Sequence, residues 1–218
     1  MSGVTRKPRP LNRDNSTFRD DRLFIVACDD TYAPAQYFNF FKLPRVQVHV
    51  TPTTDGSSAA KHVLTRLLEV EHEPDDERCM LLDTDHYVQG PHLQGFRETI
   101  KDAKKKGINI AISRPCFELW LLLHHVEESA VGSLRNAKET ESALRKQLGE
   151  YNKARLKGEH YLLASVRDAC VRARRLDEAV TGGDIPENNV SRVYLLWQAI
   201  VASAASNQLP FELVDLAR

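Results

Sequence analysis

The sequence has no apolar run long enough to cross a membrane, and its first residues lack the hydrophobic core of a secretory signal. It also has no Cys-x-x-Cys pair. Its four cysteines are widely spaced, and three of them fall in or beside apolar stretches. We therefore expect no disulfide framework and no zinc site, in a chain that works in the reducing cytoplasm without a membrane contact.

The sequence has no excess of charge of either sign, because 30 Lys and Arg residues balance 30 Asp and Glu residues. Any surface that binds nucleic acid must then come from local clustering. The Gly-x-x-x-x-Gly-Lys-Ser/Thr loop and the Gly-x-Gly-x-x-Gly motif are also missing, which argues against a small-molecule phosphotransfer enzyme. The length of 218 residues, with 42% apolar residues, suits one globular domain with or without a helical annex.

Residues 1–21 are expected to form a flexible arm, because they combine two prolines with five basic residues before the first apolar run. Such an arm is either a solvated tail or a segment that contacts phosphate groups. The folded part of the chain is expected to begin at about residue 22.

Residues 22–126 alternate short apolar runs with helical patterns. The predicted strands are Leu23–Cys28, Val46–Val50, Cys79–Leu82 and Ile108–Ile112. The predicted helices are Ala33–Lys42, Ser58–His72, His92–Lys106 and one that starts at Pro115. This order predicts an α/β fold with a mostly parallel sheet and helices on both faces. The second strand is expected nearer an edge, because its apolar and polar residues alternate.

Residues 127–218 show no further strand pattern, which predicts a helical C-terminal region packed on the α/β core. Its expected helices are Ala137–Leu148, Tyr161–Leu176 and Asn189–Ser206.

Acidic residues follow three of the predicted strands. Asp29 comes after the first, Asp83 and Asp85 after the third, and Glu118 one turn into the helix after the fourth. Carboxyl ends of parallel strands meet at one edge of a sheet, and carboxylates crowded there repel each other unless a cation is present. We therefore predict a divalent metal site held by Asp29, Asp83 and Asp85. The alternative is that these side chains cap helices or are solvated in loops.

The run SRPCFELWLLLHH places a glutamate and two histidines in a strongly apolar segment. Glu118 in such a helix needs a partner or a metal; the partner could be Arg114, four residues earlier, or Lys153. The two histidines can simply cap the end of the helix, since no third His or Cys lies at a spacing that supports zinc.

This run closely resembles the signature of RloB-like proteins, members of the Toprim superfamily. Weaker similarities follow in the family's order: LLDTDHY, Tyr151–Asn152–Lys153 and NNVSRVYLLWQAI. Together they cover residues 22–202. The resemblance implies a Toprim-like fold and a metal-dependent nuclease, commonly in bacterial antiphage defence (abortive infection) beside an AAA- or ABC-type ATPase.

On this pattern Asp83 and Asp85 would hold Mg²⁺ or Mn²⁺, while Asp29, Glu118 and Lys153 would be further catalytic residues. Arg114 and His86 are candidates for contacts with the substrate phosphate. The target can be DNA, transfer RNA or another RNA, and the sequence is compatible with a monomer or an oligomer.

The chain departs from the family at the first strand, where Asp29–Asp30 replaces the usual Glu-Gly. Aspartate reaches about 1.5 Å less than glutamate, and a misplacement of about 1 Å can cost on the order of 100-fold in rate. The alternative to a nuclease is therefore a weakened or inactive Toprim-like module that docks an ATPase or senses a ligand.

Overall fold

A five-stranded sheet forms the centre of the computed structural model, which describes residues 21–53, 59–85, 87, 92–181 and 183–217. The strand order is β2-β1-β3-β4-β5; the first four strands are parallel, and β5 runs antiparallel to β4. Except for Asp21, the arm predicted at residues 1–21 lies outside the described residues. The strands are β1 (Arg22–Cys28), β2 (Val46–Thr51), β3 (Glu77–Asp83), β4 (Asn109–Arg114) and β5 (Val190–Ser191).

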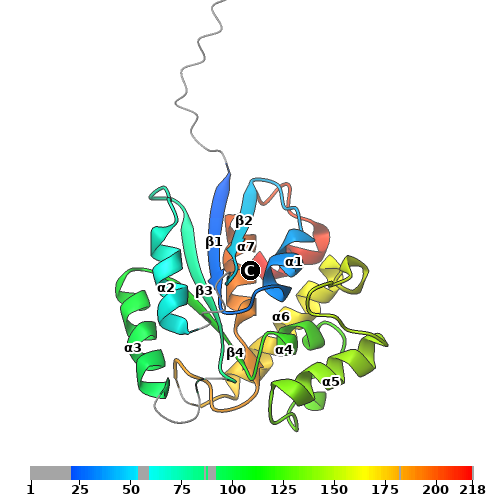
Figure 1. Ribbon diagram of the computed structural model, residues 1–218. Coiled ribbons are helices and arrows are strands. Elements are labelled where there is room, and N and C mark those ends of the chain that lie inside the picture. The colour runs from blue at the N-terminus through cyan, green and yellow to red at the C-terminus, as the bar shows by residue number, and fades with distance from the viewer. Residues whose placement is uncertain (1–20, 54–58, 86, 88–91, 182, 218) are drawn as a thin grey trace, which may run out of the picture.

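Helices cover both faces of the sheet, as the sequence predicts (Figure 1). The α-helices are α1 (Ala33–Asn39), α2 (Ala60–Glu69), α3 (His92–Lys105), α4 (Glu118–Leu123), α5 (Ala137–Leu148), α6 (Leu163–Glu178) and α7 (Val193–Ser203). The 3₁₀ helices are η1 (Glu128–Ala130), η2 (Gly158–His160) and η3 (Phe211–Ala217). None of these described helices has the length and hydropathy needed to cross a membrane.

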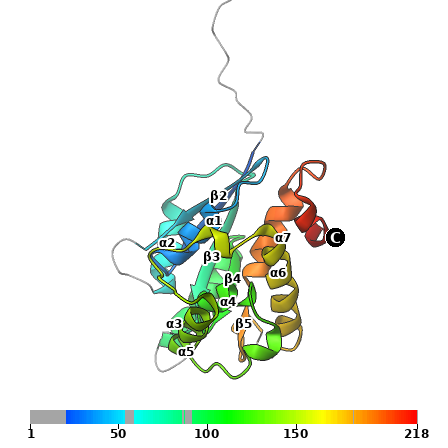
Figure 2. The ribbon, with the colours of Figure 1, turned by 90° about the vertical axis from the view of Figure 1, so that its right-hand side faces the viewer.

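Alternating residues of β1 divide the core into two layers, because successive side chains of a strand point to opposite faces. Ile25 and Ala27 pack with α2 and α3, whereas Phe24, Val26 and Cys28 pack with the other helices. In Figure 2, α6 and α7 lie side by side in the second, larger layer. The C-terminal region therefore packs on the core, and the predicted α/β fold with a helical C-terminal region is confirmed. The strand β2 lies at an edge of the sheet, also as predicted.

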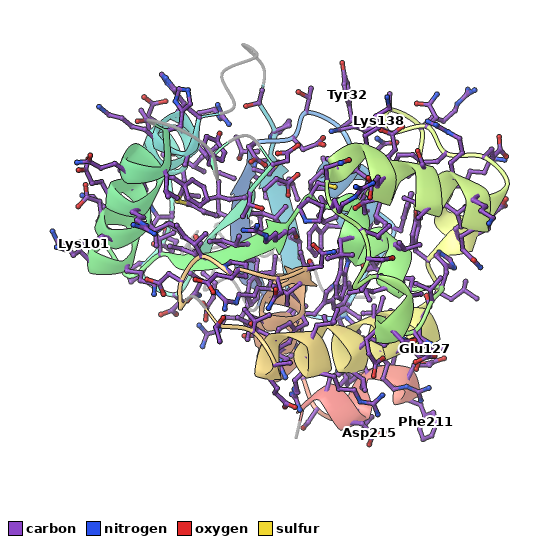
Figure 3. All side chains as sticks on the ribbon, turned by 90° about the horizontal axis from the view of Figure 1, so that it is seen from below. Tyr32, Lys101, Glu127, Lys138, Phe211 and Asp215 are labelled. Atoms are coloured by element: carbon purple, nitrogen blue, oxygen red, sulfur yellow. The ribbon has the colours of Figure 1, made fainter. Side chains whose placement is uncertain are left out.

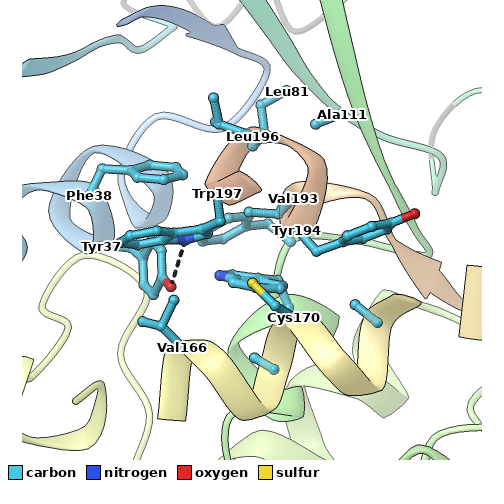
Figure 4. Packing of buried hydrophobic residues seen from close by; sticks show 14 of the residues in the cluster. Tyr37, Phe38, Leu81, Ala111, Val166, Cys170, Val193, Tyr194, Leu196 and Trp197 are labelled. Carbon is cyan, nitrogen blue, oxygen red and sulfur yellow. Dashed lines mark hydrogen bonds between the residues drawn. The ribbon is translucent and has the colours of Figure 1, made fainter. Parts of the chain in front are cut away.

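Tyr37 lies at the centre of the larger layer, surrounded by aromatic rings from several helices (Figure 4). The indole N–H of Trp197 donates to its hydroxyl oxygen over 3.1 Å, and that hydroxyl lies 3.0 Å from Nε2 of His124. On the other side of the ring, Nδ1 of His124 lies 2.9 Å from Oγ of Ser165, which donates to the Leu162 carbonyl.

These contacts fix the direction of every proton in the chain of hydrogen bonds. The Ser165 hydroxyl donates its proton to the Leu162 carbonyl, so it can only accept a hydrogen bond from Nδ1 of His124. Since the neutral ring carries one proton, Nε2 then accepts from the Tyr37 hydroxyl. Burial, with smaller contributions from His125 and Arg172, holds the pKa of His124 well below its usual value, which keeps the ring neutral. His124 occupies the C-cap position of α4, but its ring nitrogens contact Tyr37 and Ser165 and not the last carbonyls of the helix, so its side chain does not have the suggested capping role.

Two helices begin at least three residues later than predicted, and α1 and α2 each end three residues earlier than predicted. The helix predicted to start at Pro115 begins at Glu118, because the residues before it hold the turn after β3: the Pro115 carbonyl accepts the N–H groups of Thr84 and Asp85, each at 3.1 Å. The helix predicted from Asn189 begins at Val193, because Val190–Ser191 pairs with β4. The expectation that no strand follows residue 127 is therefore wrong, since a two-residue strand is too short to show a periodic pattern.

Candidate active site

Asp29 and Asp83 lie next to each other because β1 and β3 are neighbours in the sheet. Asp83 ends β3, and its backbone N–H donates to Oδ2 of Asp29 over 2.9 Å. Oδ1 of Asp29 and Oδ1 of Asp83 are both buried, and neither has a hydrogen-bond partner among the described residues. Two buried carboxylates from different strands therefore each present one unused acceptor at the same end of the sheet.

A cavity of about 280 Å³ lies at this end of the sheet. Every residue predicted to be catalytic lines this cavity. The ends of the strands form one wall, and the C-terminal region, chiefly α5, forms the opposite wall. The lining residues are Asp29, Asp30, Asp83, Asp85, Cys116, Glu118, Ala137, Lys138, Glu141 and Lys153.

The electrostatics of the carboxylate pair disfavour its charged form. Burial raises the pKa of Asp29 to about 7; the Asp83 N–H opposes this shift, while Asp30 and Asp85 add to it. Burial also raises the pKa of Asp83 well above its ordinary value, with further contributions from Asp29, Glu118 and Asp85. A cation in the cavity would remove this penalty by pairing with both carboxylates.

The turn that follows β3 holds Asp85 at the cavity. The N–H of Thr84 donates to the carbonyls of Ser113 and Pro115, and the N–H of Asp85 donates to that of Pro115, each over 3.1 Å. Thr84 is 1% exposed, whereas Asp85 is exposed. The segment between β4 and α4 thus fixes the backbone of the acidic turn and leaves the Asp85 carboxylate at the cavity mouth.

Glu118 is buried at the start of α4, and its partners come from the C-terminal region. The Tyr151 hydroxyl donates to its Oε1 over 2.9 Å, and Nζ of Lys153 lies 3.9 Å from the same oxygen. Of the two partners of Glu118 that the sequence suggests, Lys153 is therefore the one that the structure brings near it. The prediction of Arg114 as a partner is wrong, because its guanidinium donates to the Pro186 carbonyl over 3.0 Å and Arg114 does not line the cavity.

Lys153 forms its closest ion pair with Asp30, a cavity residue that the sequence did not single out as catalytic. Burial lowers the pKa of Lys153, but Glu118 and Asp30 more than offset this, so the pKa is raised and the amine stays charged. Asp30 also accepts the N–H groups of Tyr32 and Ala33, at 2.6 and 3.0 Å. Asp30 therefore links the backbone at the start of α1 to Lys153, although the N-cap residue of α1 is Tyr32.

Gln36 of α1 holds the segment that carries Lys153. Its side-chain amide donates to the Lys153 carbonyl over 3.0 Å, and its side-chain oxygen accepts the N–H of Leu156 over 2.9 Å. No pattern in the sequence connects Gln36 to residues more than 100 positions later, so only the structure identifies it. His86, the other candidate for a phosphate contact, lies outside the described residues.

The residues present suit a hard divalent cation. Among the described residues, no group of three or more His, Cys, Asp or Glu side chains is already arranged around one point as metal ligands. Mg²⁺, however, commonly binds through one or two carboxylates and keeps several waters. The unused Oδ1 oxygens of Asp29 and Asp83 fit that requirement, with Asp85 at the mouth.

The comparisons with known proteins give one match. No curated protein and no solved structure is found to match the chain. The family model described as RloB-like protein matches residues 24–200, which extend from β1 into α7 and include every residue that lines the cavity. The chain therefore belongs to the RloB-like protein family.

Proposed function

We propose that this protein is a Mg²⁺- or Mn²⁺-dependent nuclease of the Toprim type, which cleaves phosphodiester bonds of nucleic acid. The observation that carries the proposal is the pair of Asp29 and Asp83, side by side at the ends of β1 and β3. Each has one buried oxygen without a partner among the described residues, and both line the same cavity. Such an arrangement favours a cation, and with it a phosphate.

Each of the charged residues in the cavity has its own role in the proposed reaction. Asp29 and Asp83 would hold the cation, with Asp85 beside them. When bound, that cation would polarise the phosphodiester and stabilise the departing oxygen. The charged Lys153, whose side chain is 47% exposed, would offset the negative charge that develops on the phosphate.

Asp29 and Glu118 are the candidates for moving a proton. Oδ2 of Asp29 accepts the Asp83 N–H, which leaves Oδ1 as the oxygen without a partner among the described residues that could bind the cation or take a proton from the attacking group. Oε1 of Glu118 accepts the Tyr151 hydroxyl proton, and this bond holds the carboxylate at the cavity.

The family supports the biological setting of this proposal. A role in bacterial antiphage defence beside an ATPase partner follows from the RloB-like resemblance, and it is proposed on that ground alone. Cleavage should therefore be assayed with the ATPase both present and absent.

The first test is cleavage of transfer RNA, single-stranded DNA and duplex DNA by purified protein with Mg²⁺ or Mn²⁺. Asp83→Asn and Asp29→Asn should each lower the cleavage rate by at least about 100-fold, because each removes a charge that holds the cation. Asp215→Asn is the matched control: this exposed carboxylate lies far from Lys138 in Figure 3 and should leave cleavage unchanged. Unchanged cleavage in both site variants, with the fold intact, would reject the site.

A second measurement separates the nuclease from an inactive docking module. A bound ion stabilises the folded state by mass action, so millimolar Mg²⁺ or Mn²⁺ should raise the melting temperature of the wild type but not of Asp83→Asn. An unchanged melting temperature of the wild type would favour the docking module.

A further inference from the structure

Tyr32 is an exposed aromatic residue two positions after Asp30, which lines the acidic cavity. Its side chain is 51% exposed, while its backbone is fixed on both sides: its N–H donates to Oδ1 of Asp30, and its carbonyl accepts from the Gln36 amide over 3.1 Å. Isolated exposed apolar residues are common on protein surfaces. Tyr32 differs because its N–H is hydrogen-bonded to Asp30, which lines the candidate catalytic site.

Lys138 supplies positive charge to the opposite wall of the cavity. It is exposed, lies in the first turn of α5, and forms no ion pair with a described residue. The charge of Lys153, by contrast, is already paired with Asp30 and Glu118. Lys138 is therefore the lining lysine whose charge is not paired with a described carboxylate.

The lining residues as a whole indicate which kind of group can enter the cavity. Six of them are acidic and two are lysines, so a phosphate needs both a cation at Asp29 and Asp83 and an additional positive side chain. Figure 3 shows Tyr32 and Lys138 at the same edge of the molecule. An aromatic ring and a lysine at one edge of the molecule match the two parts of a nucleotide, its base and its phosphate.

We propose that the cavity takes an unpaired nucleotide of a single-stranded segment, with its base stacked on Tyr32 and a flanking phosphate held by Lys138. This inference rests on the proposed nuclease function and names the class of its substrate. A base within a duplex already has both faces covered by its neighbours, so it has no face to offer Tyr32. An unpaired base has one, and stacking of this kind tolerates any base.

Equilibrium binding tests the inference without cleavage. The probes are a short fluorescein-labelled single strand, as RNA and as DNA, and the same strand annealed to its complement, each with Ca²⁺ in place of Mg²⁺. The wild type should bind the single strand more tightly than the duplex. Tyr32→Ala should weaken single-strand binding at least about fivefold, whereas Tyr32→Phe, which keeps the ring, should bind as the wild type does.

Lys138→Gln should weaken binding of every strand and lower the slope of log affinity against log salt by about one. The matched controls are Phe211→Ala, which removes an aromatic side chain that is 87% exposed, and Lys101→Gln on α3. Both lie away from Tyr32 in Figure 3 and should leave binding unchanged.

The outcomes separate this inference from the nuclease proposal. Tyr32-dependent binding of single strands by a protein that never cleaves would reject the nuclease and keep the nucleotide site. Equal affinity for the duplex, undetectable binding of single strands, or full affinity in a folded Tyr32→Ala variant would overturn the inference, even if cleavage occurs.

Discussion

Asp29 shows most directly how a buried carboxyl can couple stability to pH. Its pKa is about 7 in the folded protein, against an ordinary value of 3.8, and the pKa of Asp83 is raised in the same direction. Between these two values the folded protein binds more protons than the unfolded chain. The contribution of Asp29 is therefore fully present below about pH 4 and is lost as the pH rises towards about 7.

We accordingly expect the metal-free protein to lose free energy of unfolding as the pH rises from about 4 to about 7, and the Asp29→Asn variant to lose less over the same range. Denaturant unfolding in the presence of a chelator measures this. Millimolar Mg²⁺ should restore stability at the upper end of the range. If the free energy of unfolding had the same pH dependence in the wild type and the variant, the pKa of Asp29 would not be raised by folding.

Tyr151 is expected to stabilise Glu118 through its hydroxyl group alone. Tyr151→Phe removes the 2.9 Å hydrogen bond to a buried carboxylate and should lower the free energy of unfolding by about 1–2 kcal/mol. Urea unfolding of the variant checks the value. Tyr194→Phe is a useful comparison, because its hydroxyl also donates to a carboxylate, that of Asp177, but outside the cavity. Both variants should lose stability, and only Tyr151→Phe should alter cleavage.

At the scale of elements, α1 positions a residue that belongs to a distant segment. Gln36→Leu removes the bonds to Lys153 and Leu156 and should loosen the segment that carries the lysine. We expect cleavage to fall about tenfold, because small displacements of a charged group weaken its effect on the reaction, while Mg²⁺ affinity measured by calorimetry stays the same. Gln94→Leu, on the exposed face of α3, is the control. Equal rates for wild type and Gln36→Leu would contradict this role.

The elements that the sequence predicts are those with a sufficiently long pattern. The apolar run Leu23–Cys28 predicts β1 almost to its ends, and Ala137–Leu148 matches α5. β5 was missed because two residues show no period, and the start of α4 was misplaced because Pro115 is engaged by a neighbouring turn. The convergence of acids was predictable because parallel strands end at one edge of a sheet. The ion pair of Lys153 with Asp30 depends on tertiary packing, which no local pattern contains.

At the scale of the whole molecule, the boundary predicted between residues 22–126 and 127–218 runs through the candidate site, which needs both parts. The first part supplies the carboxylates, and the second supplies the opposite wall, Lys153 and one strand of the sheet. The two parts also share one hydrophobic layer, in which Trp120 of α4 and Trp197 of α7 are both fully buried.

A chain truncated after residue 126 should therefore lack a cooperative thermal transition. Loss of the later helices would expose the apolar face of α4, including Trp120, which is 0% exposed in the full chain. Circular dichroism during heating tests this, with the full-length protein as reference. A sharp melting transition of the fragment would show that residues 22–126 fold independently.

The hydrogen bonds that run from Trp197 through Tyr37, His124 and Ser165 to the Leu162 carbonyl join α7, α1, the end of α4 and α6 in a single order. A donor in this series cannot exchange with an acceptor, so rotating any one helix would leave a buried polar atom without a partner. Apolar contacts alone would tolerate several nearby arrangements of these helices. The polar series selects one of them, and it thereby also fixes α4, the helix whose first residue, Glu118, lines the cavity.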